Sequence, residues 1–222
     1  PYVVKEKRKA DVFGEIHWKN SSTDFFGNTL LDSKVKTATI GSSERITDEK
    51  GVWYSQYSFT GISATQKQAY DEKNFWRFNL SAVRQQVLAN ERNLIWRLSA
   101  QLSDNSQLPS SEQFSLGGMS SVKGFTEGLL SGDQGYYIGL EYAFPLQFSK
   151  QIKGLVFIDH GSTYNSYENG MQSRDYLTST GVGLIANFAP NYFGKVLIGF
   201  PLNSSKERDR TRIHFFLETI IK

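Results

Sequence analysis

Apolar and polar residues alternate along most of this 222-residue chain, with a period of two. In the segment "RNLIWRLSAQL" the apolar positions recur at every second residue: Leu94, Trp96, Leu98, Ala100 and Leu102. The residues between them are mostly polar and include Arg97 and Gln101. This alternation predicts β-strands with one apolar and one polar face. About ten such segments occur, near residues 8–19, 28–40, 51–65, 71–86, 91–103, 134–146, 152–161, 177–188, 193–202 and 210–221.

Soluble β-sandwiches and membrane β-barrels both contain alternating strands, and three features favour the membrane barrel. The expected strands, of about 10 to 14 residues, exceed the 5–6 usual in soluble sheets and suit a tilted span of ~9–11 residues. The second face is too polar for a buried core, since it carries Arg77, Asn79, Arg97, Gln101 and Glu141. Aromatic residues gather near strand ends, as an interfacial girdle requires: Trp18, Trp53, Tyr54, Phe75, Trp76, Tyr136 and Phe144. A soluble barrel is the alternative.

We therefore predict an all-β fold, a transmembrane antiparallel β-barrel of about ten strands that closes on itself and so has no exposed edge. Residues 1–222 show no linker or composition break and are expected to form one domain, with a long loop at about 104–133 inserted into the lumen between strands five and six. Six apolar side chains should face lipid: Trp76, Phe78, Trp96, Leu98, Ile138 and Leu140. Four charged side chains should face the lumen: Arg77, Arg97, Glu141 and Asp159.

Composition narrows the classes of function. The chain has no cysteine, which excludes disulfides and thiolate metal sites. Its net charge is only +3, and no basic run is interleaved with stacking aromatics, so nucleic acid is not an expected partner. A run of ~18 apolar residues, which a membrane-spanning helix needs, is absent. The sequence begins with Pro1 and shows no signal peptide, as expected of a mature or trimmed chain.

No catalytic or metal-binding pattern stands out. The histidines, His17, His160 and His214, fall on different expected strands without ligand spacing. A Gly-x-Ser-x-Gly elbow is missing, so a hydrolase is unsupported, although a barrel lipase could assemble Ser and His across strands. In "GMSSVKG" Lys123 precedes a glycine and no helix follows, which excludes a phosphate-binding loop. We expect neither an enzyme nor a cofactor.

The stretch "FSLGGMSSVKGFTEGLLSGDQGYYIGLEY", residues 114–142, joins a Gly/Ser-rich loop to an alternating strand. Strand parity places Glu141 on the lumenal face, and the parity of Phe157-x-Asp159 places Asp159 there too. Two inward carboxylates in a narrow lumen need a cation, because unpaired buried charges are costly. Lys123 lies between glycines that permit close backbone approach, and it is the natural partner. The alternative is an exposed loop whose Lys123 faces water.

The same region resembles the TpsB transporters of two-partner secretion (the FhaC, ShlB and HecB type), in the superfamily of the BamA outer-membrane assembly factor. That family carries Val-Arg-Gly-Phe/Tyr on a loop that folds into the lumen, then Gly-x-Glu and Phe-x-Asp-x-Gly on the next two strands. The corresponding segments here are Val122-Lys123-Gly124-Phe125, Gly139-Leu140-Glu141 and Phe157-Ile158-Asp159-His160-Gly161. The resemblance therefore implies a lumenal latch, which we define as Lys123, Gly124, Phe125, Glu141 and Asp159.

The resemblance implies a bacterial outer-membrane pore that exports an unfolded partner protein, with no cofactor and no chemistry. The implied partners are that secreted protein, outer-membrane lipid, and other barrel subunits or an amino-terminal region outside these residues. Two alternatives stay open: a barrel that helps assemble or insert outer-membrane proteins, and a membrane anchor or translocator for another domain.

Two departures from the family pattern are visible. Lys123 replaces an arginine, so the latch has a flexible point charge in place of a planar fork. The family has sixteen strands preceded by two periplasmic POTRA domains, whereas this chain offers about ten strands and nothing that resembles POTRA. It is expected to be either the carboxyl-terminal part of a longer barrel or a shortened barrel of ten strands, an allowed even number.

Overall fold

The computed structural model describes residues 7–25, 28–66, 72–104, 107–147, 149–166, 172–189, 192–203 and 211–219. Ten strands form one large sheet: β1 (Lys7–Phe25), β2 (Asn28–Asp48), β3 (Gly51–Gln66), β4 (Glu72–Val87), β5 (Asn93–Ser103), β8 (Gln134–Leu146), β9 (Ser149–Ser166), β10 (Gln172–Ala189), β11 (Tyr192–Pro201) and β12 (Arg212–Thr219). The segment between β5 and β8 contains a 3-10 turn, η1 (Ser110–Glu112), and a short hairpin of β6 (Phe114–Leu116) and β7 (Leu130–Gly132). The expected all-β fold with ten strands is confirmed.

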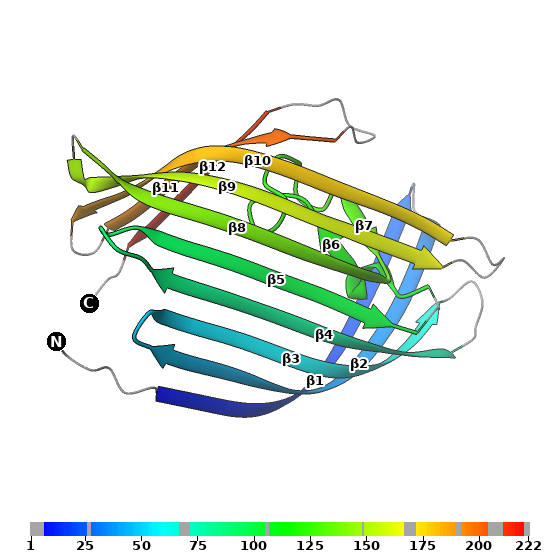
Figure 1. The fold of residues 1–222 in the computed structure, drawn as a ribbon. Coiled ribbons are helices and arrows are strands. Elements are labelled where there is room, and N and C mark those ends of the chain that lie inside the picture. The colour runs from blue at the N-terminus through cyan, green and yellow to red at the C-terminus, as the bar shows by residue number, and fades with distance from the viewer. Residues whose placement is uncertain are drawn as a thin grey trace.

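Each strand of the large sheet pairs antiparallel with the next one along it, and β5 pairs with β8 across the inserted segment (Figure 1). Tight turns join β2 to β3 and β4 to β5 at one end of the sheet. The β4–β5 turn includes Asn90 and Glu91 with φ of 59° and 57°, and asparagine tolerates this left-handed conformation well. The inserted segment leaves the opposite end, between Ser103 and Gln134, and returns there.

Several strands are longer than the alternation alone indicates. β2 continues to Asp48 instead of ending near residue 40, because Gly41 to Asp48 pair in register with Ser58 to Gly51 of β3. β1 likewise runs on through its polar residues as far as Phe25. These extensions carry serines and charged residues, which lack the alternating apolar pattern of a strand. Their backbone nevertheless pairs with the neighbouring strand.

The alternation divides the side chains between an outer convex face and an inner concave face. Trp76, Ile138 and Leu140 are exposed on the convex face, and Phe78, Trp96 and Leu98 of the same set are partly exposed there. The register continues this apolar face across the sheet, for example from Leu98 through Ile138. The expected outward set is therefore on one face, as a lipid-facing belt requires.

Two of the seven aromatics expected in an interfacial girdle lie on the other face. Tyr54 and Phe75 are direct chain neighbours of the outward Trp53 and Trp76, and neighbouring residues of a strand point to opposite faces. Phe75 is buried on the concave side, in a cluster with Val35. The prediction took aromatics near strand ends without asking which face each residue occupies, and it was wrong for Tyr54 and Phe75.

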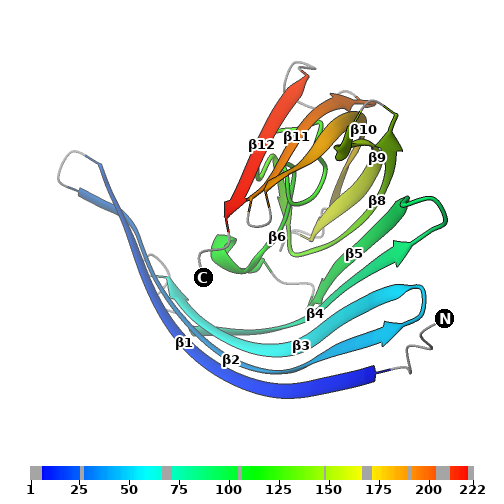
Figure 2. The ribbon, with the colours of Figure 1, turned by 90° about the vertical axis from the view of Figure 1, so that its left-hand side faces the viewer.

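The sheet is strongly curved but open, which corrects the expectation of a barrel closed by these ten strands. Figure 2 shows β8–β12 curling round the inserted segment, while β1–β4 extend away as a broad trough. Within the described residues β1 and β12 are edge strands that pair on one side only. The physical requirement that edges be paired, which motivated closure, is thus not met by these ten strands alone.

The concave face is covered in part by the inserted segment. Its apolar residues join two buried clusters, one made of Val35, Ile62, Ala64, Phe75 and Leu108, the other of Leu116, Val122, Phe125, Tyr137 and Leu177. A third cluster comprises Ala143, Leu155, Phe157 and Leu197. The loop expected between strands five and six therefore packs against the inside of the sheet.

In the described parts of the chain no helix has the length and apolar character of a membrane span.

Candidate functional site

The inserted segment, which we call the lumenal loop (residues 104–133), turns back on itself at three glycines with positive φ. Gly117, Gly118 and Gly128 have φ of 110°, 89° and 65°, values that side chains rarely tolerate. The turn is closed by hydrogen bonds from Gly118 N to the Phe125 carbonyl (3.1 Å) and from Phe125 N to the Val122 carbonyl (3.2 Å). The glycines thus fold a compact tip that presents Lys123 to the sheet.

Lys123 ends between two carboxylates of adjacent strands. Its Nζ lies 2.9 Å and 3.1 Å from the two carboxylate oxygens of Asp159 on β9, and 3.2 Å from Oε1 of Glu141 on β8. The backbone N–H of Lys123 also donates to Asp159 Oδ2 (3.2 Å). The exposed fractions are 2% for Lys123, 0% for Asp159 and 1% for Glu141. The three charges are therefore removed from solvent together.

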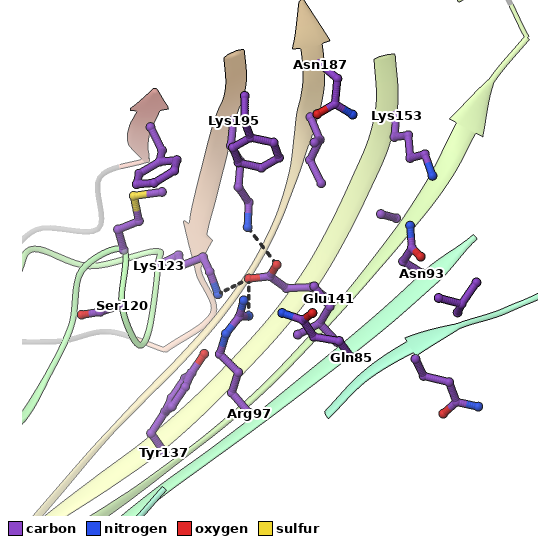
Figure 3. A pocket seen from close by; sticks show the side chains of 18 residues that line it. Gln85, Asn93, Arg97, Ser120, Lys123, Tyr137, Glu141, Lys153, Asn187 and Lys195 are labelled. Atoms are coloured by element: carbon purple, nitrogen blue, oxygen red, sulfur yellow. Dashed lines mark hydrogen bonds and ion pairs between the residues drawn. The ribbon is translucent and has the colours of Figure 1, made fainter. Parts of the chain in front are cut away.

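Glu141 has two further cationic partners, both on the wall of the sheet. Arg97 Nη1 donates to its Oε1 and Lys195 Nζ donates to its Oε2, each at 2.8 Å (Figure 3). Asp159 Oδ1 instead accepts a hydrogen bond from the Tyr137 hydroxyl (2.9 Å). Glu141 thus stays paired without the loop, whereas Lys123 is the cation that the structure gives to Asp159 among the described residues.

The backbone around Lys123 is also held by the last strands. Gly124 N donates to Ser179 Oγ of β10 (3.0 Å), and His214 Nε2 of β12 is 2.8 Å from the Lys123 carbonyl oxygen. A Cβ added at Gly124 would lie 2.6 Å from the Ser179 Cβ, too close for any side chain. The loop therefore contacts β8, β9, β10 and β12 at once, and glycine at position 124 is what permits the approach.

Phe125 is buried beside this charged centre, at 4% exposure. It packs with Leu116 and Val122 of the loop and with Tyr137 and Leu177 of the wall. The ring of Phe157 lies 4.7 Å from Lys123 Nζ, close enough for a cation–π contact. Apolar packing thus covers one side of the ion pairs. Lys123, Asp159 and Glu141 are almost fully removed from solvent, which strengthens their attraction.

A cavity of about 710 Å³ lies against this centre, on the inside of the sheet (Figure 3). Lys123, Met119 and Ser120 of the loop form part of its wall. The strands contribute polar side chains, among them Gln85, Asn93, Arg97, Glu141, Lys153, Asn187 and Lys195. Four of its lining residues are cationic and only Glu141 is anionic, so the cavity wall carries an excess of positive charge.

The structure brings together the five residues predicted for the lumenal latch, and it places all four charges predicted to face inward on the concave side. Arg77 and Arg97 bind Glu112 and Glu141 there. The sequence did not single out Lys195, Tyr137, Ser179 or His214 as contacts of the site. Their strand parity was readable, but the distance between strands far apart in sequence was not.

The histidines have ordinary strand-face partners. His17 lies 3.2 Å from Glu15, His160 contacts Tyr136 and Thr178, and His214 binds the loop backbone. Over the described residues, no group of three or more His, Asp or Glu is placed to hold a metal ion. The latch consists of charge pairs that hold the loop against the sheet.

Comparison with known proteins matches this chain to a family of secretion proteins. The family model described as haemolysin secretion/activation protein ShlB/FhaC/HecB matches residues 5–186. The heme/hemopexin transporter protein HuxB of Haemophilus influenzae is 26% identical over 214 residues, which is 91% of this chain and 34% of HuxB. A second HuxB sequence is 27% identical over 141 residues, or 60% of this chain and 25% of that protein.

Two solved structures share the fold. CdiB from Acinetobacter baumannii has a TM-score of 0.72 and 18% identity, covering 96% of this chain and 39% of CdiB. CdiB from Escherichia coli has a TM-score of 0.65 and 17% identity, covering 96% of this chain and 46% of that protein. The matches thus cover 34% and 25% of the two curated relatives, and less than half of each solved structure.

Proposed function

Because the chain belongs to the haemolysin secretion/activation protein family ShlB/FhaC/HecB, we propose that it forms wall and plug of an outer-membrane pore that exports an unfolded partner protein. The family consists of secretion transporters and not of enzymes. Within this proposal residues 1–222 belong to one barrel domain, which further strands complete, and the lumenal loop is the plug.

The observation that carries the proposal is the loop held on the concave face by Lys123 and Asp159. A loop fixed there occupies space through which a polypeptide would pass. Its hold is reversible, because the attraction between buried charges is largely offset by the cost of removing them from water. We infer that the loop closes the pore at rest and leaves its site when a partner protein enters.

The open edges of the sheet bear on the size of the pore. A barrel of ~8 strands has room only for its own side chains or one small ligand, and ten strands enclosing a loop would leave little more. β1 and β12 are unpaired on one side within the described residues, and the chain covers 39% of the CdiB structure from A. baumannii. We infer that these edges pair with further strands in a wider barrel, through which an extended chain fits.

Export is tested by expressing the intact transporter together with a candidate partner protein and measuring that partner in the culture medium. We expect the partner outside the cell only when the transporter is present. A transporter that assembles in the outer membrane and conducts ions but releases no partner would refute export. Defective assembly of other outer-membrane proteins in its absence would instead support an assembly-factor role.

A further inference from the structure

A second buried charge cluster lies in the lumenal loop, at η1, eleven residues before Lys123. Glu112 is fully buried, with Lys19 Nζ of β1 at 2.6 Å from its Oε1 and Arg77 Nη1 of β4 at 3.1 Å from its Oε2. The polarity is reversed relative to the latch, since here the loop supplies the carboxylate and the wall supplies the cations. Strand parity did not reveal this cluster, because Glu112 lies outside the strands.

The backbone of η1 is attached to the same wall. The Glu112 carbonyl oxygen accepts hydrogen bonds from Arg77 Nη1 (3.1 Å) and from Gln101 Nε2 of β5 (3.0 Å). Gln101 also donates to the carbonyl of Asp133 (3.0 Å), which joins the two ends of the loop. Asp133 Oδ1 in turn accepts from Leu108 N at 2.9 Å. The base of the loop is thus one hydrogen-bonded unit.

An apolar contact supports the same attachment independently of charge. Leu108 is buried among Val35 of β2, Ile62 of β3 and Phe75 of β4. The first part of the loop is therefore fixed to β1–β5, whereas the tip around Lys123 is fixed to β8–β12. These are the two walls that the loop bridges, as Figure 2 shows.

We propose that Glu112, with Lys19 and Arg77, is a second anchor that holds the base of the lumenal loop when the latch releases Lys123. Eleven extended residues span at most roughly 36–40 Å, so the tip can leave its site without moving Glu112. Glu112 is then a positioning residue about which the loop swings. This inference rests on the proposed role of the loop as a plug.

The test is single-channel recording on the intact transporter in planar bilayers, without a partner protein. Glu112→Gln removes the charge with almost no change of shape, and Lys19→Gln removes one of its partners, half exposed and so tolerant of change. Glu127→Gln is the matched control, because Glu127 is exposed on the same loop and its carboxylate accepts a hydrogen bond from Ser120, which also belongs to the loop. Each change is made in the wild type and in a Lys123→Ala background.

We expect Glu112→Gln and Lys19→Gln to have little effect while Lys123 still holds the tip. In the Lys123→Ala background each should lengthen the fully open state roughly tenfold or more, the factor that corresponds to one lost charge-assisted hydrogen bond. Glu127→Gln should change neither background. If Glu112→Gln matches Glu127→Gln in both backgrounds, with the barrel folded as judged by its gel mobility before heating, there is no second anchor.

The result does not depend on export, because conductance is measured without a partner. A transporter that exports nothing but shows the expected synergy between Glu112 and Lys123 would refute the proposed function and support the anchor. A transporter that exports normally without any synergy would support the proposed function and refute the anchor.

Discussion

At the scale of single residues, the two carboxylates of the latch differ in what they lose when the loop leaves. Glu141 keeps Arg97 and Lys195, both on the wall, whereas Asp159 has Lys123 as its cationic partner in the described structure. Asp159 is therefore the group whose pairing depends on the position of the loop. Glu141 in contrast neutralises cations of the wall whether or not the loop is present.

This difference predicts unequal effects on stability. Glu141→Gln leaves Arg97, Lys195 and Lys123 close together with one carboxylate fewer, and we expect it to cost about 3–5 kcal/mol of unfolding free energy. Asp159→Asn leaves only Lys123 less well paired and should cost about 1–3 kcal/mol. Urea unfolding of the purified protein in lipid vesicles measures both. Equal losses for the two variants would show that the wall cations do not depend on Glu141.

A second prediction at this scale concerns Gly199 of β11, which packs against the backbone of the lumenal loop. A Cβ added at Gly199 would lie 2.7 Å from the Lys123 carbonyl carbon and 2.9 Å from Gly124 N. We expect Gly199→Ala to displace the tip and raise channel opening, while every ion-pairing side chain is retained. Gly61→Ala is the matched control, because a Cβ there meets nothing within 4 Å. Closed channels in Gly199→Ala would mean that the tip adjusts to the added methyl group.

At the scale of strands, the alternation assigns adjacent residues of β4 to lipid and to the wet interior. Leu80 continues the outer apolar face of Trp76 and Phe78, while its neighbour Ser81 lies on the concave face, in register with Ser99 of β5. We expect Leu80→Arg to destabilise the folded protein in lipid by ~2–4 kcal/mol, the cost of arginine near the bilayer midplane. Ser81→Arg should cost less than 1 kcal/mol because its charge reaches water (about 0–1 kcal/mol for a solvated surface change). Equal costs would contradict the assignment of faces.

The strands were the most predictable part of this molecule, because alternation requires only neighbouring residues to be compared. Their ends were less predictable. The polar extension of β2 beyond residue 40 is set by pairing with β3, a contact between strands that single-strand patterns do not contain. Parity also located Glu141 and Asp159 correctly on the inner face, although it could not show which cations approach them.

The contacts of the loop depended on information beyond alternation. The motif around Lys123 identified the tip by its resemblance to a family, and the structure places that tip against Asp159. Glu112 and its partner Lys19 are 93 residues apart in the sequence, with no regular spacing to connect them. Only the fold brings such residues together, so the second anchor had no signal in the sequence.

At the scale of the whole molecule, the ten strands form a curved wall with two free edges and an occupied interior within the described residues. The free edges show that these ten strands do not form a small closed barrel. The alternation alone could not distinguish such a barrel from part of a wider one. The lumenal loop bridges the two halves of the wall, through Glu112 on one side and Lys123 on the other. The loop thus contacts both halves of the wall and lies in the concave interior between them.

The central claim is that Lys123 holds the lumenal loop as a plug, and single-channel recording of the intact transporter with Lys123→Ala and Lys123→Arg tests it most directly. Lys123→Ala leaves the buried Asp159 unpaired, and we expect the open probability to rise about tenfold or more. Lys123→Arg should stay close to the wild type or open less, since arginine can bind a carboxylate with two parallel hydrogen bonds. An open probability in Lys123→Ala equal to that of the wild type, in a correctly folded barrel, would contradict the claim.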